Sequence, residues 1–247
     1  MMDAMTSRSR VLLAVGLALL GIAGVVVVGA SPSMQPRSQA ASSAVPAPDV
    51  DEPVPSSPTL ETAVLAGGCF WGVQGVFQHV KGVTAAESGY AGGDAATANY
   101  DTVSGGETGH AESVRVTYDP TQVTFGQLLH VYFAVVTDPT QLNRQGPDVG
   151  TQYRSAIFAQ DAIQQKVAAA YIAQLDQAGV FPAKIVTTVS PKAEFFPAEA
   201  YHQDFLNSNP SYPYIAANDM PKLEALRTTF PAQYRAQPVL MLAAGGQ

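Results

Sequence analysis

The chain has 247 residues, of which 47% are apolar and 13% charged, so it can bury a core and is not disordered throughout. Its net charge of −7, from 13 basic and 20 acidic side chains, leaves little material for the basic face that nucleic-acid binding requires. The single cysteine, Cys69, excludes internal disulfides and metal sites built from several cysteines.

The first 30 residues have the features of a targeting segment. Arg8 and Arg10 precede a charge-free run over 11–30, and small residues lie just before Ser31. The run of 20 residues is also just long enough to cross a bilayer. We therefore expect either a cleaved signal peptide or a retained N-terminal membrane anchor. In both cases the rest is exported to the periplasm or another extracytoplasmic space, and any membrane contact is through this segment.

Residues 31–59 are rich in Pro, Ser and Ala and have no periodic apolar pattern, which predicts an extended linker. One folded domain over 60–237 and a C-terminal tail over 238–247 follow.

In the first half of the domain, the apolar run 62–66 predicts a short strand that ends at two glycines, and a helical run begins at Cys69. Alternation over 112–118 predicts a half-buried strand. Residues 124–136 are the clearest helix, because Thr124 and Gln127 form a capping box ahead of an apolar stripe.

In the second half, 153–159 and 184–189 are predicted strands. A helix between them begins after Asp161, turns an apolar face inward and stops at Gly179. The predicted inward positions of that helix are Ile163, Val167, Tyr171 and Leu175. Proline starts two short helices, over 197–207 and 221–230.

This irregular alternation predicts an α+β domain. We expect a two-layer sandwich in which helices flank a central mixed or antiparallel sheet with a ferredoxin-like core and long glycine-rich loops.

Cys69 lies between a glycine turn and a helix, in the motif Gly-Gly-Cys-Phe-Trp-Gly over 67–72. A thiol at a helix N-terminus faces unpaired N–H groups, which favours the thiolate and lowers the thiol pKa. The alternative is an inert cysteine buried in a well-packed turn.

Three further glycine-bearing loops carry acids and tyrosines at predicted strand ends. Glu112 follows the loop 105–111, Tyr100 follows the loop 89–93, and Asp148 and Tyr153 lie in the loop 143–154. Loops of this composition commonly form the rim of a pocket.

These motifs resemble the A-type peptide methionine sulfoxide reductase family. The resemblance covers residues 61–235, and the matching segments occur in order at family spacing: Gly-Cys-Phe-Trp-Gly at 68–72, Gly-His-Ala-Glu at 109–112, Asp-Pro-Thr-Gln at 138–141, Gly-Thr-Gln-Tyr-Arg-Ser at 150–155 and Tyr-His-Gln-Asp-Phe at 201–205.

The resemblance implies a thiol-dependent reductase specific for methionine-S-sulfoxide, both in proteins and free. Cys69 would be the nucleophile that becomes a sulfenic acid. Phe70 and Trp71 would hold the substrate methyl group. The sulfoxide oxygen would be surrounded by Glu112, Tyr100 and Tyr153, with Asp148 organising that side. Burial would raise the pKa of Glu112 enough for it to donate a proton near neutral pH.

Many family members carry further cysteines near the C-terminus, and this chain has none. Its oxidised form must therefore be recycled by an external thiol, either a small thiol or a thioredoxin-like protein. The expected partners are this reductant and oxidised exported proteins, which the enzyme would repair as a monomer. We expect no bound cofactor, and no metal, because His79, His110, His130 and His202 lack paired ligand spacing.

Two other functions are compatible with parts of the pattern. A thiol transferase or hydrolase would pair Cys69 with a histidine base, whereas the motifs supply an acid and phenols instead. A non-catalytic binding module on the same fold would not need Cys69 or Glu112, and both are present.

Overall fold

A computed structural model describes residues 45–241. The predicted targeting segment, 1–30, lies outside the described residues. No helix within 45–241 has the length and apolar character needed to cross a membrane.

A six-stranded sheet forms the centre of the domain, in the order β7-β6-β1-β3-β2-β8. Its strands are β1 (Glu61–Gly67), β2 (Val83–Ala91), β3 (Ala111–Tyr118), β6 (Ser155–Phe158), β7 (Thr188–Ser190) and β8 (Phe195–Pro197). β7 runs parallel to β6 and the other neighbours are antiparallel, so the sheet is mixed. β4 (Arg144–Gln145) and β5 (Asp148–Val149) form a separate small ribbon.

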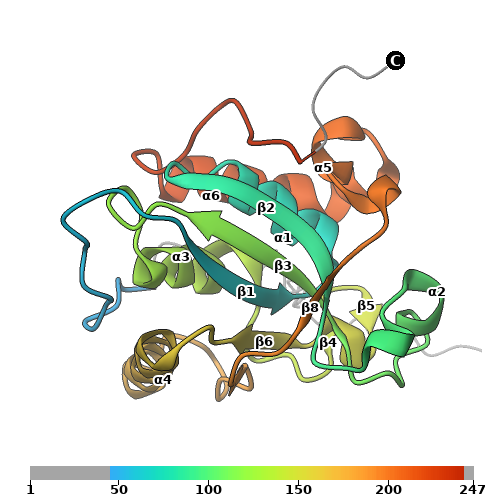
Figure 1. The fold of residues 1–247 in the computed structure, drawn as a ribbon, viewed down its shortest axis with the longest axis horizontal. Helices are drawn as coiled ribbons and strands as arrows, with labels where there is room; N and C mark the ends of the chain where they lie inside the picture. Colours follow the sequence, from blue (N-terminus) through green and yellow to red (C-terminus); the bar gives the residue numbers. More distant parts are fainter. Residues whose placement is uncertain (1–44, 242–247) are drawn as a thin grey trace, which may run out of the picture. The chain divides into compact units, whose positions relative to one another are not determined.

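The helices are α1 (Phe70–Gln78), α2 (Tyr100–Val103), α3 (Phe125–Val131), α4 (Ala162–Gln177), α5 (Phe205–Ser208) and α6 (Met220–Thr229). Two π-helical turns, Tyr132–Val136 and Ile215–Asp219, continue α3 and precede α6. In Figure 1, α1 and α6 lie behind β2 and β3. With α1 between β1 and β2, and α3 between β3 and β6, the four central strands have the expected ferredoxin-like order. The predicted α+β class is confirmed.

Alternating side chains of the strands divide between the two faces of the sheet. Leu65, Val116 and Ile157 belong to the large core that the helices cover, together with Phe77 of α1 and Leu128 of α3. The neighbouring strand positions form a smaller cluster on the other face: Val64, Ala66, Ala91, Ala111, Ala156 and Phe158. Side chains of β1, β3 and β6 therefore alternate between a large apolar core on one face of the sheet and a smaller one on the other.

The capping box of α3 is present as predicted, and upstream residues reinforce it. Thr124 accepts a hydrogen bond from the backbone N–H of Gln127 and donates its own N–H to the Gln127 side chain. Asp51 accepts the N–H of Gly126 at 2.8 Å, and Glu52 accepts the N–H of Phe125 at 2.7 Å. These two acids lie in the range predicted as a linker, so its last part makes specific contacts with the domain.

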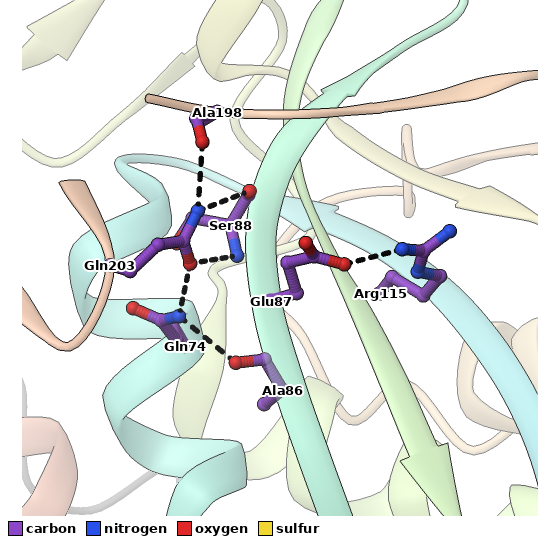
Figure 2. Close-up of polar contacts among 7 residues, drawn as sticks. All are labelled: Gln74, Ala86, Glu87, Ser88, Arg115, Ala198 and Gln203. Carbon is purple, nitrogen blue, oxygen red and sulfur yellow. Dashed lines mark hydrogen bonds and ion pairs between the residues drawn. The ribbon is translucent and has the colours of Figure 1, made fainter. Parts of the chain in front are cut away.

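Two glutamines join α1 to β2 and to the segment that precedes α5 (Figure 2). Gln74 Nε2 donates to the carbonyl of Ala86 at 2.9 Å and to Gln203 Oε1 at 2.7 Å. Gln203 accepts from Ser88 N–H and donates to the carbonyls of Ser88 and Ala198. Since both amides are buried and paired, they fix the start of α5 against the first helix.

Several predicted elements differ from the structure. The predicted helix over 197–207 consists of the end of β8, a 3-10 turn and the short α5 (Figure 1), because Asp204 has a φ of 59° and interrupts any helix there. The predicted strand over 184–189 pairs only from Thr188 onward. Ile163, predicted to face the core, is 47% exposed.

Candidate active site

The cysteine lies just after a turn that requires glycine. β1 ends at Gly67, and Gly68 has a φ of +99°, a conformation that residues with a Cβ rarely adopt. A Cβ on Gly68 would lie 2.7 Å from the side chain of Gln145. Gln145 is buried and hydrogen-bonded to Thr137 and Asp138. The chain therefore turns sharply at this point and directs Cys69 into the N-terminus of α1.

Cys69 is the N-cap residue of α1 and is partly exposed. We predicted a lowered thiol pKa from this position, and that prediction is wrong for the free site. Burial, followed by the carboxylates of Glu112 and Asp219, raises the pKa of Cys69 well above its ordinary value. The backbone N–H of Trp71 acts in the opposite direction but does not outweigh them. The resting residue is therefore a neutral thiol.

Glu112 is placed beside the cysteine by β3. Its side chain is buried, and its Oε2 accepts the backbone N–H of Phe70, the first residue of α1, at 2.9 Å. This bond satisfies one of the unpaired donors of the helix N-terminus. Burial raises the pKa of Glu112 to about 8, with a smaller contribution from Asp148, while the Phe70 hydrogen bond opposes the shift. The carboxyl group is therefore mostly protonated at neutral pH, as predicted.

Two tyrosine hydroxyls face the same space from different loops. Tyr100 is the first residue of α2, and its backbone N–H donates to Glu199 at 2.9 Å. Tyr153 closes the 3-10 turn Thr151–Tyr153. Burial, together with the nearby Glu112, raises the pKa of both phenols, so each keeps its proton and can donate it in a hydrogen bond.

Phe70 and Trp71 form an aromatic wall on the first turn of α1. Phe70 is buried, and Trp71 stacks on Phe205 with ring centroids 3.8 Å apart. The indole Nε1 donates to His202 Nδ1 at 3.0 Å. Burial lowers the pKa of His202, which keeps the ring neutral and able to accept this bond. His202 thus holds the indole in position.

These side chains enclose one cavity of about 170 Å³. Its lining residues are Cys69, Phe70, Trp71, Tyr100, Glu112, Asp148, Tyr153 and Tyr214. All seven residues predicted from the sequence are thus brought together. None of these lining residues is a histidine, so a thiol–histidine hydrolase receives no support here.

Sequence reasoning did not identify Tyr214, Asp219 or Lys222. The Tyr214 hydroxyl donates to the Asp148 carboxylate, which ties the C-terminal segment to the loop of β5. Asp219 is fully buried and lies 3.2 Å from Lys222, measured from Oδ1 to Nζ. Tyr214 and Asp219 lie at the two ends of a π-helical turn, and Lys222 lies in α6. No motif marks them, and only their proximity in the fold shows that they belong to the site.

Within residues 45–241, no group of three or more His, Cys, Asp or Glu side chains is arranged to hold a metal ion. The chemistry that the cavity offers is that of a thiol, a protonated carboxyl group and phenolic donors beside an apolar wall. A ligand with a polar oxygen close to a methyl group would fit this combination, because the donors can bind the oxygen and the apolar wall can contact the methyl.

Comparison with known proteins identifies the same chemistry. The family model described as peptide methionine sulfoxide reductase matches residues 61–234. The chain is 61% identical over 189 residues to peptide methionine sulfoxide reductase MsrA 2 of Mesorhizobium japonicum, covering 76% of this chain and 97% of the relative. It is 50% identical over 198 residues to the Synechocystis protein of the same name, covering 79% and 92%.

Solved structures agree with this relationship. Methionine sulfoxide reductase A of Corynebacterium diphtheriae is similar with a TM-score of 0.54 and 36% identity, over 68% of this chain and 89% of that one. The reduced form of Mxr1 from Saccharomyces cerevisiae gives a TM-score of 0.55 and 32% identity, over 64% and 92%. The chain therefore belongs to the peptide methionine sulfoxide reductase family, as an enzyme of the MsrA type that reduces the S-oxide of peptide methionine.

Proposed function

We propose that Cys69 and Glu112 together carry out the reduction of methionine-S-sulfoxide in this cavity. The observation that carries the proposal is the position of Glu112. Its carboxyl group lines the same cavity as the thiol and has a pKa of about 8. A sulfoxide oxygen must be protonated as it leaves sulfur, and an acid that is protonated at neutral pH can supply that proton.

The proposed step is balanced without any further reactant. The Cys69 sulfur forms a bond to the sulfoxide sulfur while Glu112 protonates the oxygen. The oxygen then moves to the Cys69 sulfur as its bond to the methionine sulfur and the new sulfur–sulfur bond break, which gives methionine and a Cys69 sulfenic acid. The proton of the thiol returns to Glu112. The raised pKa values of both groups support this scheme, because both protons are present at the start.

The remaining side chains orient the substrate. Tyr100 and Tyr153 would donate hydrogen bonds to the oxygen as negative charge develops on it, as donors do in an oxyanion hole. Phe70 and Trp71 would receive the methyl group. Asp148 of β5 accepts the Tyr214 hydroxyl. This contact would keep β5 beside the position of the sulfoxide oxygen. Because the aromatic wall and the oxygen donors have fixed positions, the site accommodates only one epimer of the sulfoxide.

Regeneration then depends on an external thiol, because Cys69 is the only cysteine in the chain. We propose a small thiol or a thioredoxin-like protein as reductant, with no bound cofactor. We further propose that residues 1–30 export or anchor the enzyme, and that it repairs oxidised extracytoplasmic proteins as a monomer. The apolar run after Arg8 and Arg10 supports the export proposal.

Single-turnover analysis without reductant tests the cysteine scheme. The full chain, mixed with excess methionine-S-sulfoxide, should form one methionine per enzyme, and mass spectrometry should find one oxygen on Cys69 and no disulfide. The R epimer should give no burst. Two methionines per chain would require a second reducing group and would contradict the proposal.

A further inference from the structure

A second, smaller recess of about 80 Å³ also reaches Cys69. It shares Cys69, Asp148 and Tyr214 with the first cavity. Its other lining residues are Gln145, Gly146, Pro147, Asn218 and Lys222. The aromatic wall and the groups proposed to bind the sulfoxide oxygen do not line it. Cys69 is thus open to two spaces of different chemistry, joined where Tyr214 donates to Asp148.

Lys222 is held at this recess by a buried partner. Its Nζ lies 3.2 Å from Oδ1 of Asp219, which is fully buried. A Cβ on Gly72 would lie 2.1 Å from the same Oδ1 and 3.2 Å from Nζ. The ion pair therefore packs against the first turn of α1, three residues after Cys69. Among the residues that line the two spaces, Lys222 is the one cation.

We propose that this recess is where the external reductant reaches Cys69, and that Lys222 attracts the incoming thiolate. The inference rests on the proposed function, in which Cys69 becomes a sulfenic acid that no second cysteine can reduce. The ligand class is a thiol whose reactive form is an anion. Of the charged groups at the recess, the Lys222 ammonium favours that anion over the neutral thiol, while the carboxylates of Asp219 and Asp148 oppose it.

The reaction at the recess is a thiol–sulfenic acid exchange. The thiolate sulfur forms a bond to the Cys69 sulfur as the sulfur–oxygen bond breaks, and the sulfenic hydroxyl takes up one proton from Glu112 and leaves as water. The product is a mixed disulfide, in which the sulfenic sulfur has been reduced and the thiol oxidised. A second thiolate then attacks the reductant's sulfur and releases Cys69.

Access to Cys69 from the recess, separate from the first cavity, favours this displacement. The nucleophile must approach the Cys69 sulfur away from the oxygen that it displaces, and Glu112, Tyr100 and Tyr153 lie around the first cavity. A thiol entering through the recess meets Cys69 without passing those donors. Glu112 can then protonate the departing oxygen from the same position that it holds in the first step.

The test separates the thiol step from the sulfoxide reaction. Hydrogen peroxide converts Cys69 of the full chain to the sulfenic acid, as checked by mass spectrometry, so no sulfoxide is needed. Reduction is then followed with three thiols of similar size, 2-mercaptoethanesulfonate, 2-mercaptoethanol and cysteamine, each compared at equal thiolate concentration and low salt. The measured quantity is the ratio of the rate constants for the anionic and the cationic thiol. Taken within one variant, this ratio cancels changes in the reactivity of Cys69 itself.

In Lys222→Gln we expect the ratio to fall about tenfold, whereas Lys222→Arg keeps the charge and should retain it. Lys166→Gln, which removes an exposed cation of α4, is the matched control and should leave the ratio unchanged. An unchanged ratio in Lys222→Gln, or an equal loss in Lys222→Arg, would overturn the inference. Failure of the sulfoxide reaction would instead appear in the single-turnover assay, as the absence of methionine.

Discussion

Replacement of Glu112 by glutamine tests the assignment of the acid most directly. Glutamine has nearly the same shape, and its amide oxygen can still accept the Phe70 N–H that Glu112 accepts at 2.9 Å. The first turn of α1 and the position of Cys69 should therefore be preserved. The variant loses one property, a proton that can be transferred to the departing oxygen.

The size of the effect follows from the raised pKa. With a pKa of about 8, Glu112 is protonated in about 90% of molecules at pH 7, whereas a carboxyl of pKa 4.5 would be protonated in about 0.3%. Burial thus makes the acid available some 300 times more often than in water. Loss of a general acid slows chemistry by roughly 10²–10⁴-fold. We expect the single-turnover rate of methionine formation to fall within that range while sulfoxide binding persists.

The pH profile supplies an independent readout. In the wild type, the rate of the sulfoxide step should decrease above about pH 8, because Glu112 then loses its proton. Glu112→Gln should lack this limb. The exposed Glu107→Gln is the matched control and should behave as the wild type. A Glu112→Gln enzyme within about fivefold of the wild-type rate, with the limb retained, would show that another group donates the proton.

Three further substitutions test the supporting structure. Trp71→Phe removes the hydrogen bond to His202 and part of the aromatic wall. Steady-state kinetics should therefore show a larger rise in KM than fall in kcat. A larger fall in kcat would place Trp71 in the chemical step. Gly72→Ala should lower the free energy of unfolding by about 1–3 kcal/mol in urea titrations, because its Cβ would lie 2.1 Å from the buried Asp219, and the exposed Gly105→Ala should have little effect. Asp51→Ala removes an acceptor for Gly126 N–H and should cost about 1 kcal/mol in the same assay, whereas an unchanged value would mean that the Asp51 hydrogen bond does not stabilise α3.

The sequence predicted best those elements in which local preference and tertiary packing agree. α3 begins at its capping box, and α4 begins after Asp161 and ends before Gly179, whose φ is +59°. By contrast, β2 was not predicted. Its sequence, VTAAESGYA, is rich in small residues, and most of its residues from Ala86 onward are buried, so it lacks the alternation of a half-buried strand. Pairing with β3 and β8 is what makes it a strand.

The site was predicted where motifs follow regular elements and missed where only tertiary contacts define it. Cys69 and Glu112 flank recognisable elements, and the structure places both in one cavity. Tyr214 and Lys222 lie more than 140 residues after Cys69, on either side of a π-helical turn. The pKa of Cys69 was mispredicted for a related reason. The helix N-terminus can be read from sequence, whereas the burial of the thiol and the carboxyl groups of Glu112 and Asp219 beside it cannot.

The helix N-terminus still has a role in the reaction, through the acid. Glu112 accepts the N–H of Phe70, so the same turn of α1 that carries the nucleophile also contacts the proton donor. When Glu112 gives up its proton, the negative charge that forms on it lies at the positive end of α1 and against an existing hydrogen bond. Desolvation keeps the acid protonated before the reaction, and the helix end stabilises its anion during the reaction. A pKa of about 8 reflects this balance: without burial the proton would already be gone at pH 7, and without the Phe70 N–H it would be harder to release.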